Sequence, residues 1–243
     1  MARSQAVHSG GRPEAFPERV DLLAMTSSDP RPLAEELLLL CADPATGRLR
    51  SPTTFPTAVA GAVLAELQLT GTITVEDRRI TAFRPLDDHD ELAARVLTEL
   101  DRAGGSRHRT TLDHALGELR YRNAPRRHLD RLTDQGVLTV RTPGFLGLPR
   151  RRWTAVRPNT GALIAERVAA TLARTADSGP TTPAEQRDHQ LAGLIGAAGL
   201  ERRLYRGAEG EPARRAVRRL ARSLPVPAAV SRAVARRRRA MSS

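Results

Sequence analysis

The 243-residue sequence has no lysine, one cysteine and few aromatic residues, and each shortage narrows the structures it can form. With Cys41 alone, the chain cannot form an internal disulfide or a cysteine-based metal site, and this thiol is predicted to be a buried, small apolar residue. Aromatic residues make up 3% of the chain, although 40% of it is hydrophobic, so the core must consist of Leu, Ala and Val. Such a core favours helix packing over aromatic-rich strands, and the fold is predicted to be mainly α.

Long apolar runs are missing too. The most apolar stretch, LAEELLLLCADPATGRL at residues 33–49, has four consecutive leucines, but two glutamates precede them and Asp43 and Pro44 follow closely. A bilayer span needs roughly 20 apolar residues, so this stretch is predicted to be a core helix. The N-terminal residues also lack the cationic segment and apolar stretch of a secretory signal, which predicts a cytoplasmic protein.

Catalytic motifs are a further absence. The sequence has no G-x-S-x-G elbow, no P-loop and no H-E-x-x-H, and the glycines at 193, 196 and 199 lie in a helical pattern without the strand that precedes a nucleotide-binding fingerprint. The acidic stretch DDHDE at 87–91 could supply metal ligands, but it directly precedes an apolar helical pattern and is better explained as an acidic helix start. We therefore expect no enzymatic activity, no cofactor and no metal.

What the sequence has in excess is arginine. All 39 basic residues are Arg, and the formal net charge is +12. The charge is unevenly placed, because residues 201–243 contain 13 Arg and 3 Glu and carry +10, whereas residues 1–200 carry +2. Such a basic stretch is typical of proteins that bind polyanions, either nucleic-acid phosphates or anionic lipid head groups. A solvated, Arg-rich helix face is the alternative.

Apolar periodicity predicts a single, mainly helical domain with one or two short β-hairpins at 32–239, between a mobile segment at 1–31 and a tail at 240–243. Two helix-glycine-hairpin units are predicted, at 57–83, where the helix to Leu69 has one apolar face, and at 129–156. Gly193 and Gly196 allow close contact between helices. Further helices are predicted at 32–41, 91–100, 111–120, 160–175, 185–198, 212–224 and 227–239, with a short strand at 47–50.

One candidate binding site is the helix start in YRNAPRRHLDRLTDQGVL, where Asn123 can cap a helix with Pro125 in its first turn. Arg122, Arg126 and Arg127 surround this start, and cations are poorly placed there because a helix N-terminus carries the positive end of its dipole. A bound phosphate would resolve the conflict. The alternative is that Asp113 or Glu118 neutralises these arginines.

A second candidate is the turn TPGFLGLPRRRW in the later hairpin. It combines apolar residues with cations and an interfacial aromatic, namely Phe145, Leu146, Leu148, Arg150, Arg151, Arg152 and Trp153. This mixture is suited to an anionic membrane surface, where apolar area drives insertion and the arginines add attraction. Alternatively, the same tip could bury itself in a protein partner or in a second copy of the chain, as a homo-oligomer.

The order of these pieces resembles the Golgi phosphoprotein 3 family, including its bacterial, actinobacterial-like members. The resemblance rests on the phrases L-L-L-L-x-x-D-x-x-T-G-x-L at 37–49 and A-G-A-x-L-x-E-L-x-L-x-G at 60–71, followed by RLTDQGVLTV and its hairpin. It implies a mainly helical domain with a protruding hairpin and no enzymatic activity. It also implies peripheral binding to anionic membrane lipids through phosphatidylinositol 4-phosphate, here at the inner face of the membrane.

The resemblance carries over to the lipid pocket only in part. The aromatic residue of the family corresponds to Phe55, and the arginine before its glycine is replaced by Ala60. Of the family's pair of arginines, Arg122 matches, whereas the later position is Pro125, with Arg126 next to it. The implied head-group site is therefore Phe55, Arg122, Arg126 and Arg127, with phosphatidylinositol 4-phosphate or another acidic lipid as its ligand.

Two other classes of function compete with this one. Helix-glycine-hairpin units resemble winged helices in outline, and an Arg-rich stretch could follow the phosphate backbone of DNA. Against this, the helix at 57–69 contains no arginine and is poorly suited to read a groove. Nucleic acid is thus the less favoured partner, and a protein-interaction scaffold is the third reading.

Overall fold

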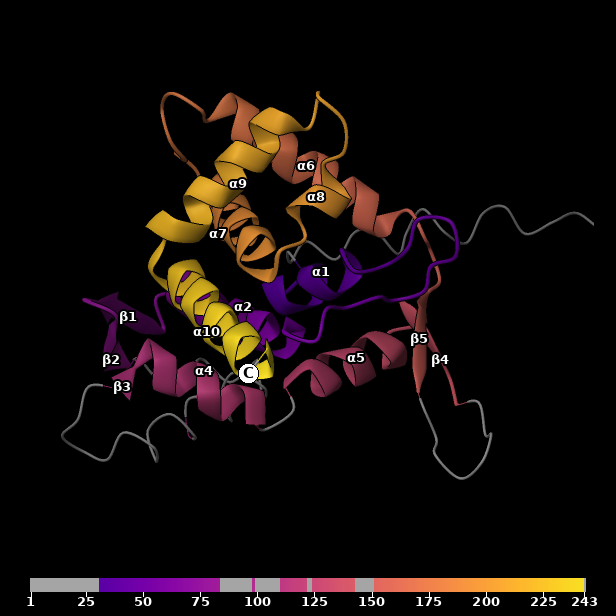
Figure 1. Ribbon diagram of the computed structural model, residues 1–243, viewed down its shortest axis with the longest axis horizontal. Coiled ribbons are helices and arrows are strands. Elements are labelled where there is room, and N and C mark those ends of the chain that lie inside the picture. Colours follow the sequence, from indigo (N-terminus) through magenta and orange to yellow (C-terminus); the bar gives the residue numbers. More distant parts are fainter. Residues whose placement is uncertain (1–30, 84–97, 99–109, 122–123, 143–150, 243) are drawn as a thin grey trace, which may run out of the picture. The chain divides into compact units, whose positions relative to one another are not determined.

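A computed structural model describes residues 31–83, 98, 110–121, 124–142 and 151–242. Within these residues there are nine helices and two small antiparallel sheets, so the fold is mainly α, as predicted (Figure 1). The helices are α1 (Leu33–Leu39), α2 (Phe55–Leu69), α4 (Leu112–Tyr121), α5 (Ala124–Asp134), α6 (Thr160–Arg174), α7 (Pro183–Ala198), α8 (Glu201–Leu204), α9 (Glu211–Ser223) and α10 (Pro225–Ser242). The strands are β1 (Ile73–Glu76), β2 (Arg79–Phe83), β3 (Thr110–Thr111), β4 (Leu138–Arg141) and β5 (Arg152–Ala155). The helix predicted at 91–100 and the stretch at 87–91 lie outside the described residues, apart from position 98.

The leucine-rich stretch forms α1, and all seven of its residues are buried. Cys41 follows the helix and is fully buried, as predicted. Burial disfavours the thiolate and raises the pKa of this thiol to about 12, even though Arg203 opposes the shift. Cys41 therefore serves as a small apolar residue of the core.

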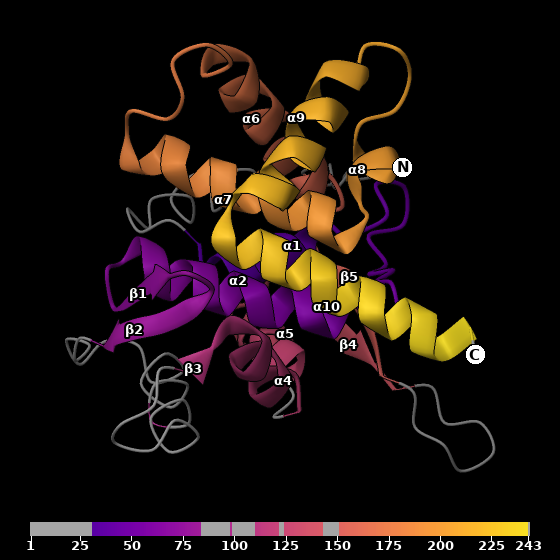
Figure 2. The same ribbon diagram turned by 60° about the vertical axis from the view of Figure 1, so that its left-hand side comes forward.

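Helix α2 differs from the prediction of one apolar face. It is buried on nearly all sides, because α1, α4, α5, α7 and α10 all pack against it. Its small residues make this possible: a Cβ atom on Gly61 would lie 2.2 Å from Val230 Cγ2 of α10. Both views show α10 lying along α2 (Figures 1 and 2). A helix with Ala and Gly between its larger residues can thus be the centre of the core, and not its edge.

The predicted close contacts at Gly193 and Gly196 are confirmed. A Cβ atom on Gly193 would lie 2.7 Å from Pro227 Cγ of α10, and one on Gly196 would lie 2.8 Å from the Val217 oxygen of α9. These glycines let α7 pack tightly against both basic C-terminal helices. The Arg-rich end of the chain is therefore folded on the core through α9 and α10.

Both predicted hairpins are present. In the first, Glu76 pairs with Arg79, and the two turn residues Asp77 and Arg78 have φ values of 45° and 66°, as a two-residue primed turn requires. Strand β3, which the sequence did not predict, adds to its edge. In the second, β4 pairs with β5 from Leu138 opposite Ala155 onward.

The stretch predicted as a strand at 47–50 holds the second hairpin to the domain. It forms isolated bridges from Leu49 to Ala42 and from Arg48 to Thr154, so it lies along the edge of β5. The Ala155 amide also donates to the Gly47 oxygen at 2.8 Å. Gly47 has φ of +67°, and a Cβ atom there would lie 2.6 Å from that strand's backbone, so only glycine fits without strain.

Charged side chains join α1 to the helices around it. Arg167 of α6 donates two hydrogen bonds to Glu36, at 2.9 and 3.1 Å, and lies 2.9 Å from Asp188 of α7. Arg187 of α7 holds Glu66 of α2 at 2.5 Å in the same manner. The pairs to Glu36 explain how a glutamate can lie buried in a leucine-rich helix.

Candidate anion-binding surfaces

The predicted head-group residues separate into two groups. Phe55 begins α2 and is 2% exposed, so its side chain belongs to the core. Arg126 and Arg127 lie in the first turn of α5, with Arg126 exposed and Arg127 half-buried. Arg122 and Asn123, predicted as phosphate ligand and helix cap, lie outside the described residues.

The inner side of α5 faces a buried carboxylate of α1. Glu35 Oε1 lies 3.4 Å from Arg131 Nε and 3.8 Å from Nδ1 of the buried His128, and Arg31 lies 3.3 Å from the other oxygen. This carboxylate therefore holds Arg131 of α5 to the domain. Among the described residues, Glu35 does not pair with Arg126 or Arg127 in the first turn of α5.

The acids named as neutralising alternatives do not pair with Arg126. Asp113 lies 2.6 Å from Arg236 of α10 and 3.2 Å from Arg78, away from the α5 start. The partner of Arg126 is instead Asp130 of the next turn, at 3.6 Å. This pair is half exposed at both residues, so it is weak.

The second hairpin lies beside α5 (Figure 1) and contributes further arginines. Arg141 of β4 stands directly opposite Arg152 of β5, and both side chains are exposed. Like charges opposite each other destabilise a strand pair. Arg151 precedes β5 and lies 3.5 Å from Asp130. We call Arg126, Arg127, Asp130, Arg141, Arg151 and Arg152 the α5–hairpin surface.

Trp153, predicted to contact the membrane, is the second residue of β5. Its side chain is half-buried and packs against the core opposite Val140. Trp153 therefore anchors the hairpin to the domain. The remaining residues of the predicted membrane tip, Phe145, Leu146, Leu148 and Arg150, lie outside the described residues.

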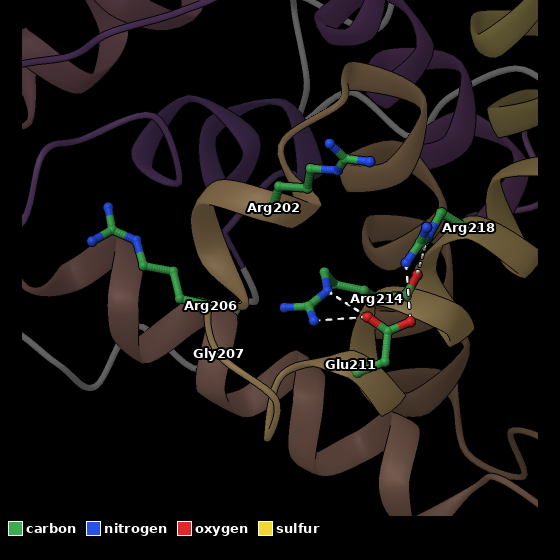
Figure 3. Close-up of a pocket in the computed structure, with 6 residues that line it drawn as sticks. All are labelled: Arg202, Arg206, Gly207, Glu211, Arg214 and Arg218. Atoms are coloured by element: carbon green, nitrogen blue, oxygen red, sulfur yellow. Dashed lines mark hydrogen bonds and ion pairs between the residues drawn. The ribbon is translucent and has the colours of Figure 1, made fainter.

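A second cationic site lies between α8 and α9, and the sequence reasoning missed it. A cavity of about 480 Å³ is lined by Arg202, Arg206, Gly207, Glu211, Arg214 and Arg218. Figure 3 shows these residues. Sequence reasoning treated the C-terminal charge as one undivided stretch. The available signal was ERRLYRGAEGEPARRAVRR, in which arginine clusters flank a glycine-rich turn that brings them together. We call this site the α8–α9 pocket.

Neither surface contains the elements of a metal site. Among the residues that the structure describes, no group of three or more His, Cys, Asp or Glu side chains could hold a metal ion. The described helices also include none that is both long and apolar enough to cross a bilayer.

These features define a class of protein: a mainly helical domain with two small hairpin sheets and with arginines gathered on two surfaces. The sequence profile of the Golgi phosphoprotein 3 (GPP34) family matches residues 33–237. The chain therefore belongs to this family, which confirms the resemblance seen in its sequence. Comparison with curated proteins gives no match.

Proposed function

We propose that the protein binds peripherally to membranes that contain anionic phospholipid, and that the α5–hairpin surface makes this contact. The main observation in support is that Arg141 and Arg152 face each other across the two strands with exposed side chains, and that Arg151 directly precedes Arg152. Three cations at one end of a hairpin repel one another in water. Anionic phosphates between them would remove that repulsion.

The energetics favour a lipid surface as the source of those phosphates. Each Arg close to an anionic leaflet contributes about 1 kcal/mol, so this surface supplies several kcal/mol before any insertion. The sequence between β4 and β5 adds Phe145, Leu146 and Leu148 as apolar residues for the interface. Such binding would hold the protein at the inner face of the membrane, with no catalytic role.

The proposal covers anionic phospholipid in general, with phosphatidylinositol 4-phosphate as one candidate. At the position of the family's pocket arginine this chain has Ala60, which is fully buried in α2 and has no side-chain donor. Phe55 is also withdrawn into the core. The exposed arginines that remain attract phosphate without the geometry that would select one head group.

The test is vesicle flotation across a salt series, with vesicles of phosphatidylcholine alone, with added phosphatidylserine, and with added phosphatidylinositol 4-phosphate. Arg141→Gln with Arg152→Gln should lower affinity for both acidic vesicles about 25-fold, from the two charges lost near the leaflet. The matched control is Arg79→Gln with Arg174→Gln, which removes the same charge from exposed positions on β2 and α6. Equal binding of the parent to neutral vesicles, or equal loss in both variants, would contradict the proposal.

A DNA shift assay at the same salt concentrations separates lipid binding from the nucleic-acid alternative. If DNA binds more tightly than acidic vesicles, and Arg141→Gln with Arg152→Gln weakens it, the surface serves nucleic acid and the lipid proposal is wrong.

A further inference from the structure

The α8–α9 pocket is lined almost entirely by charged side chains. Four arginines and one glutamate surround it, and Gly207 is its remaining lining residue. Arg202 comes from α8, Arg206 from the connection after it, and Arg214 and Arg218 from successive turns of α9. At neutral pH these five side chains carry a net charge of +3.

The one carboxylate of the pocket is already occupied. Glu211 Oε2 accepts from Arg214 Nε at 2.9 Å and from Nη2 at 2.7 Å, while Oε1 accepts from Arg218 Nη2 at 3.3 Å. The hydrogen bonds from Arg214 and the nearby positive charges hold the pKa of Glu211 below its usual range. Glu211 thus remains ionised and orients two guanidinium groups, as Figure 3 shows.

The other two arginines have no acid partner. Among the described residues, the Arg202 side chain has no hydrogen bond or ion pair, and the Arg206 side chain donates only through Nε, to the Arg203 oxygen at 3.2 Å. Figure 3 shows their guanidinium groups apart from the Glu211 cluster and from each other. Most of their N–H donors are therefore available to a ligand.

The backbone that carries these arginines is held in place. Arg203, between them, donates to the Arg50 oxygen at 2.8 Å and to the Leu40 oxygen at 2.5 Å, which joins α8 to the end of the α1 region. Arg214 also donates to the Tyr205 oxygen. The pocket is thus formed before a ligand arrives, which lowers the ordering cost of binding.

The chemistry of the lining selects the ligand class. Among the residues that the structure describes, no apolar side chain lines the pocket, so an apolar ligand would gain little there. Several guanidinium groups surround one space and offer many N–H donors. A phosphate group has more oxygens to accept from them than a carboxylate ligand has. The cavity of about 480 Å³ is larger than a bare phosphate needs and is within the usual range for small-molecule sites, roughly 300 to 1,000 Å³.

We infer that the α8–α9 pocket binds a phosphomonoester, either the head group of a lipid or a soluble phosphorylated small molecule. The site shares no residue with the α5–hairpin surface, and both views place α9 well away from α5 (Figures 1 and 2). Phosphate binding in this pocket can therefore be tested independently of the proposed membrane contact.

The first experiment is calorimetric titration of the full chain with inorganic phosphate and with glycerol 3-phosphate. Arg202→Gln with Arg206→Gln should weaken binding of both at least about tenfold, because two charge-assisted contacts are lost. The matched control is Arg215→Gln with Arg219→Gln, which removes the same charge from exposed positions of α9 outside the pocket and should change affinity less than about threefold.

A gain-of-binding variant guards against loss through misfolding. Glu211→Gln removes the competing carboxylate and raises the net charge of the lining, so phosphate should bind several-fold more tightly. Absence of binding by the parent, equal loss in both arginine variants, or weaker binding by Glu211→Gln would each overturn the inference.

Vesicles distinguish the two sources of the phosphomonoester. Vesicles of phosphatidylcholine with phosphatidic acid present a lipid phosphomonoester, and vesicles with phosphatidylserine are matched to them in surface charge. A lipid ligand predicts that Arg202→Gln with Arg206→Gln weakens binding to phosphatidic acid more than to phosphatidylserine. A soluble ligand predicts that both vesicles are affected alike while glycerol 3-phosphate binding still falls.

Discussion

Arg151 Nη1 lies 3.5 Å from Asp130 Oδ1, so the loop-side end of β5 is joined to a carboxylate of α5. The other oxygen of Asp130 lies 3.6 Å from Arg126 Nε. One carboxylate thus counters two arginines that come from different elements. Both contacts are long and half exposed, so they tune the charge of the surface more than they stabilise the fold.

Asp130→Asn should therefore strengthen binding to acidic vesicles. Removing this charge leaves Arg126 and Arg151 free to face phosphate, and one unit of charge near an anionic leaflet corresponds to about fivefold in affinity. The free energy of unfolding should change by less than about 1 kcal/mol. Asp177→Asn, with the same change in charge at an exposed position after α6, is the control for flotation. An unchanged or lower affinity for Asp130→Asn would show that Asp130 does not limit the surface.

Variants of the predicted apolar tip should lose vesicle binding but keep binding of a soluble head group, unlike variants of the arginines. Phe145→Asp with Leu146→Asp should reduce binding to every acidic vesicle by about tenfold or more, since the apolar area available for insertion is lost. Affinity for a soluble head group, measured by calorimetry, should not change. Exchanging the two residues, as Phe145→Leu with Leu146→Phe, keeps the apolar area and should bind normally. Normal co-sedimentation of the aspartate variant would remove these residues from the proposal.

The start of α5 should govern contact with the head group. Arg126→Gln with Arg127→Gln should weaken binding of a soluble phosphorylated head group on the order of tenfold, because charge-assisted contacts to phosphate are lost. Binding to all acidic vesicles should fall as well, because these arginines attract phosphate without selecting one head group. A parent-like calorimetric titration would show that these arginines are not head-group ligands.

Sequence patterns predicted local structure well wherever one physical signal dominated. The EDRR turn was predictable because two turn residues between alternating apolar strands leave few backbone solutions. The buried α1 followed from leucines that are too few for a membrane, and Gly193 and Gly196 indicated close helix contacts.

Features that depend on distant partners were not predictable in this way. Helix α2 is buried on nearly all sides because five helices pack against it, and the sequence of α2 does not indicate which helices these are. Similarly, Asp130 is exposed and ordinary in sequence, and its role appears only when Arg151 folds back beside it. The α8–α9 pocket was missed because a count of charge does not show which arginines face one space.

Tight packing between α7 and α9 makes a stability prediction with a built-in control. Gly196→Ala should lower the free energy of unfolding by about 1 to 2 kcal/mol, because the new Cβ would lie 2.8 Å from the Val217 oxygen and 2.9 Å from Ala221 Cβ. Gly117→Ala in α4 meets nothing within 4 Å and should instead stabilise by roughly 0.5 to 1 kcal/mol through helix propensity. Equilibrium urea unfolding measures both. If both variants raise the free energy of unfolding, the contact between α7 and α9 at Gly196 is looser than the geometry indicates.

The capping box of α7 should make stability depend on pH in an acidic window. Backbone and hydroxyl hydrogen bonds from Thr181, with the Thr182 amide, lower the pKa of Glu185 from 4.5 to about 2. Because the folded-state pKa lies below the unfolded one, the stabilisation is complete above pH 4.5 and is lost as pH falls toward 2. Glu185→Gln should therefore be less stable than the parent at neutral pH, and the difference between them should shrink through this window. Urea unfolding at a series of pH values measures it, and a difference that stays constant down to pH 2 would show that the ionised carboxylate does not stabilise the cap.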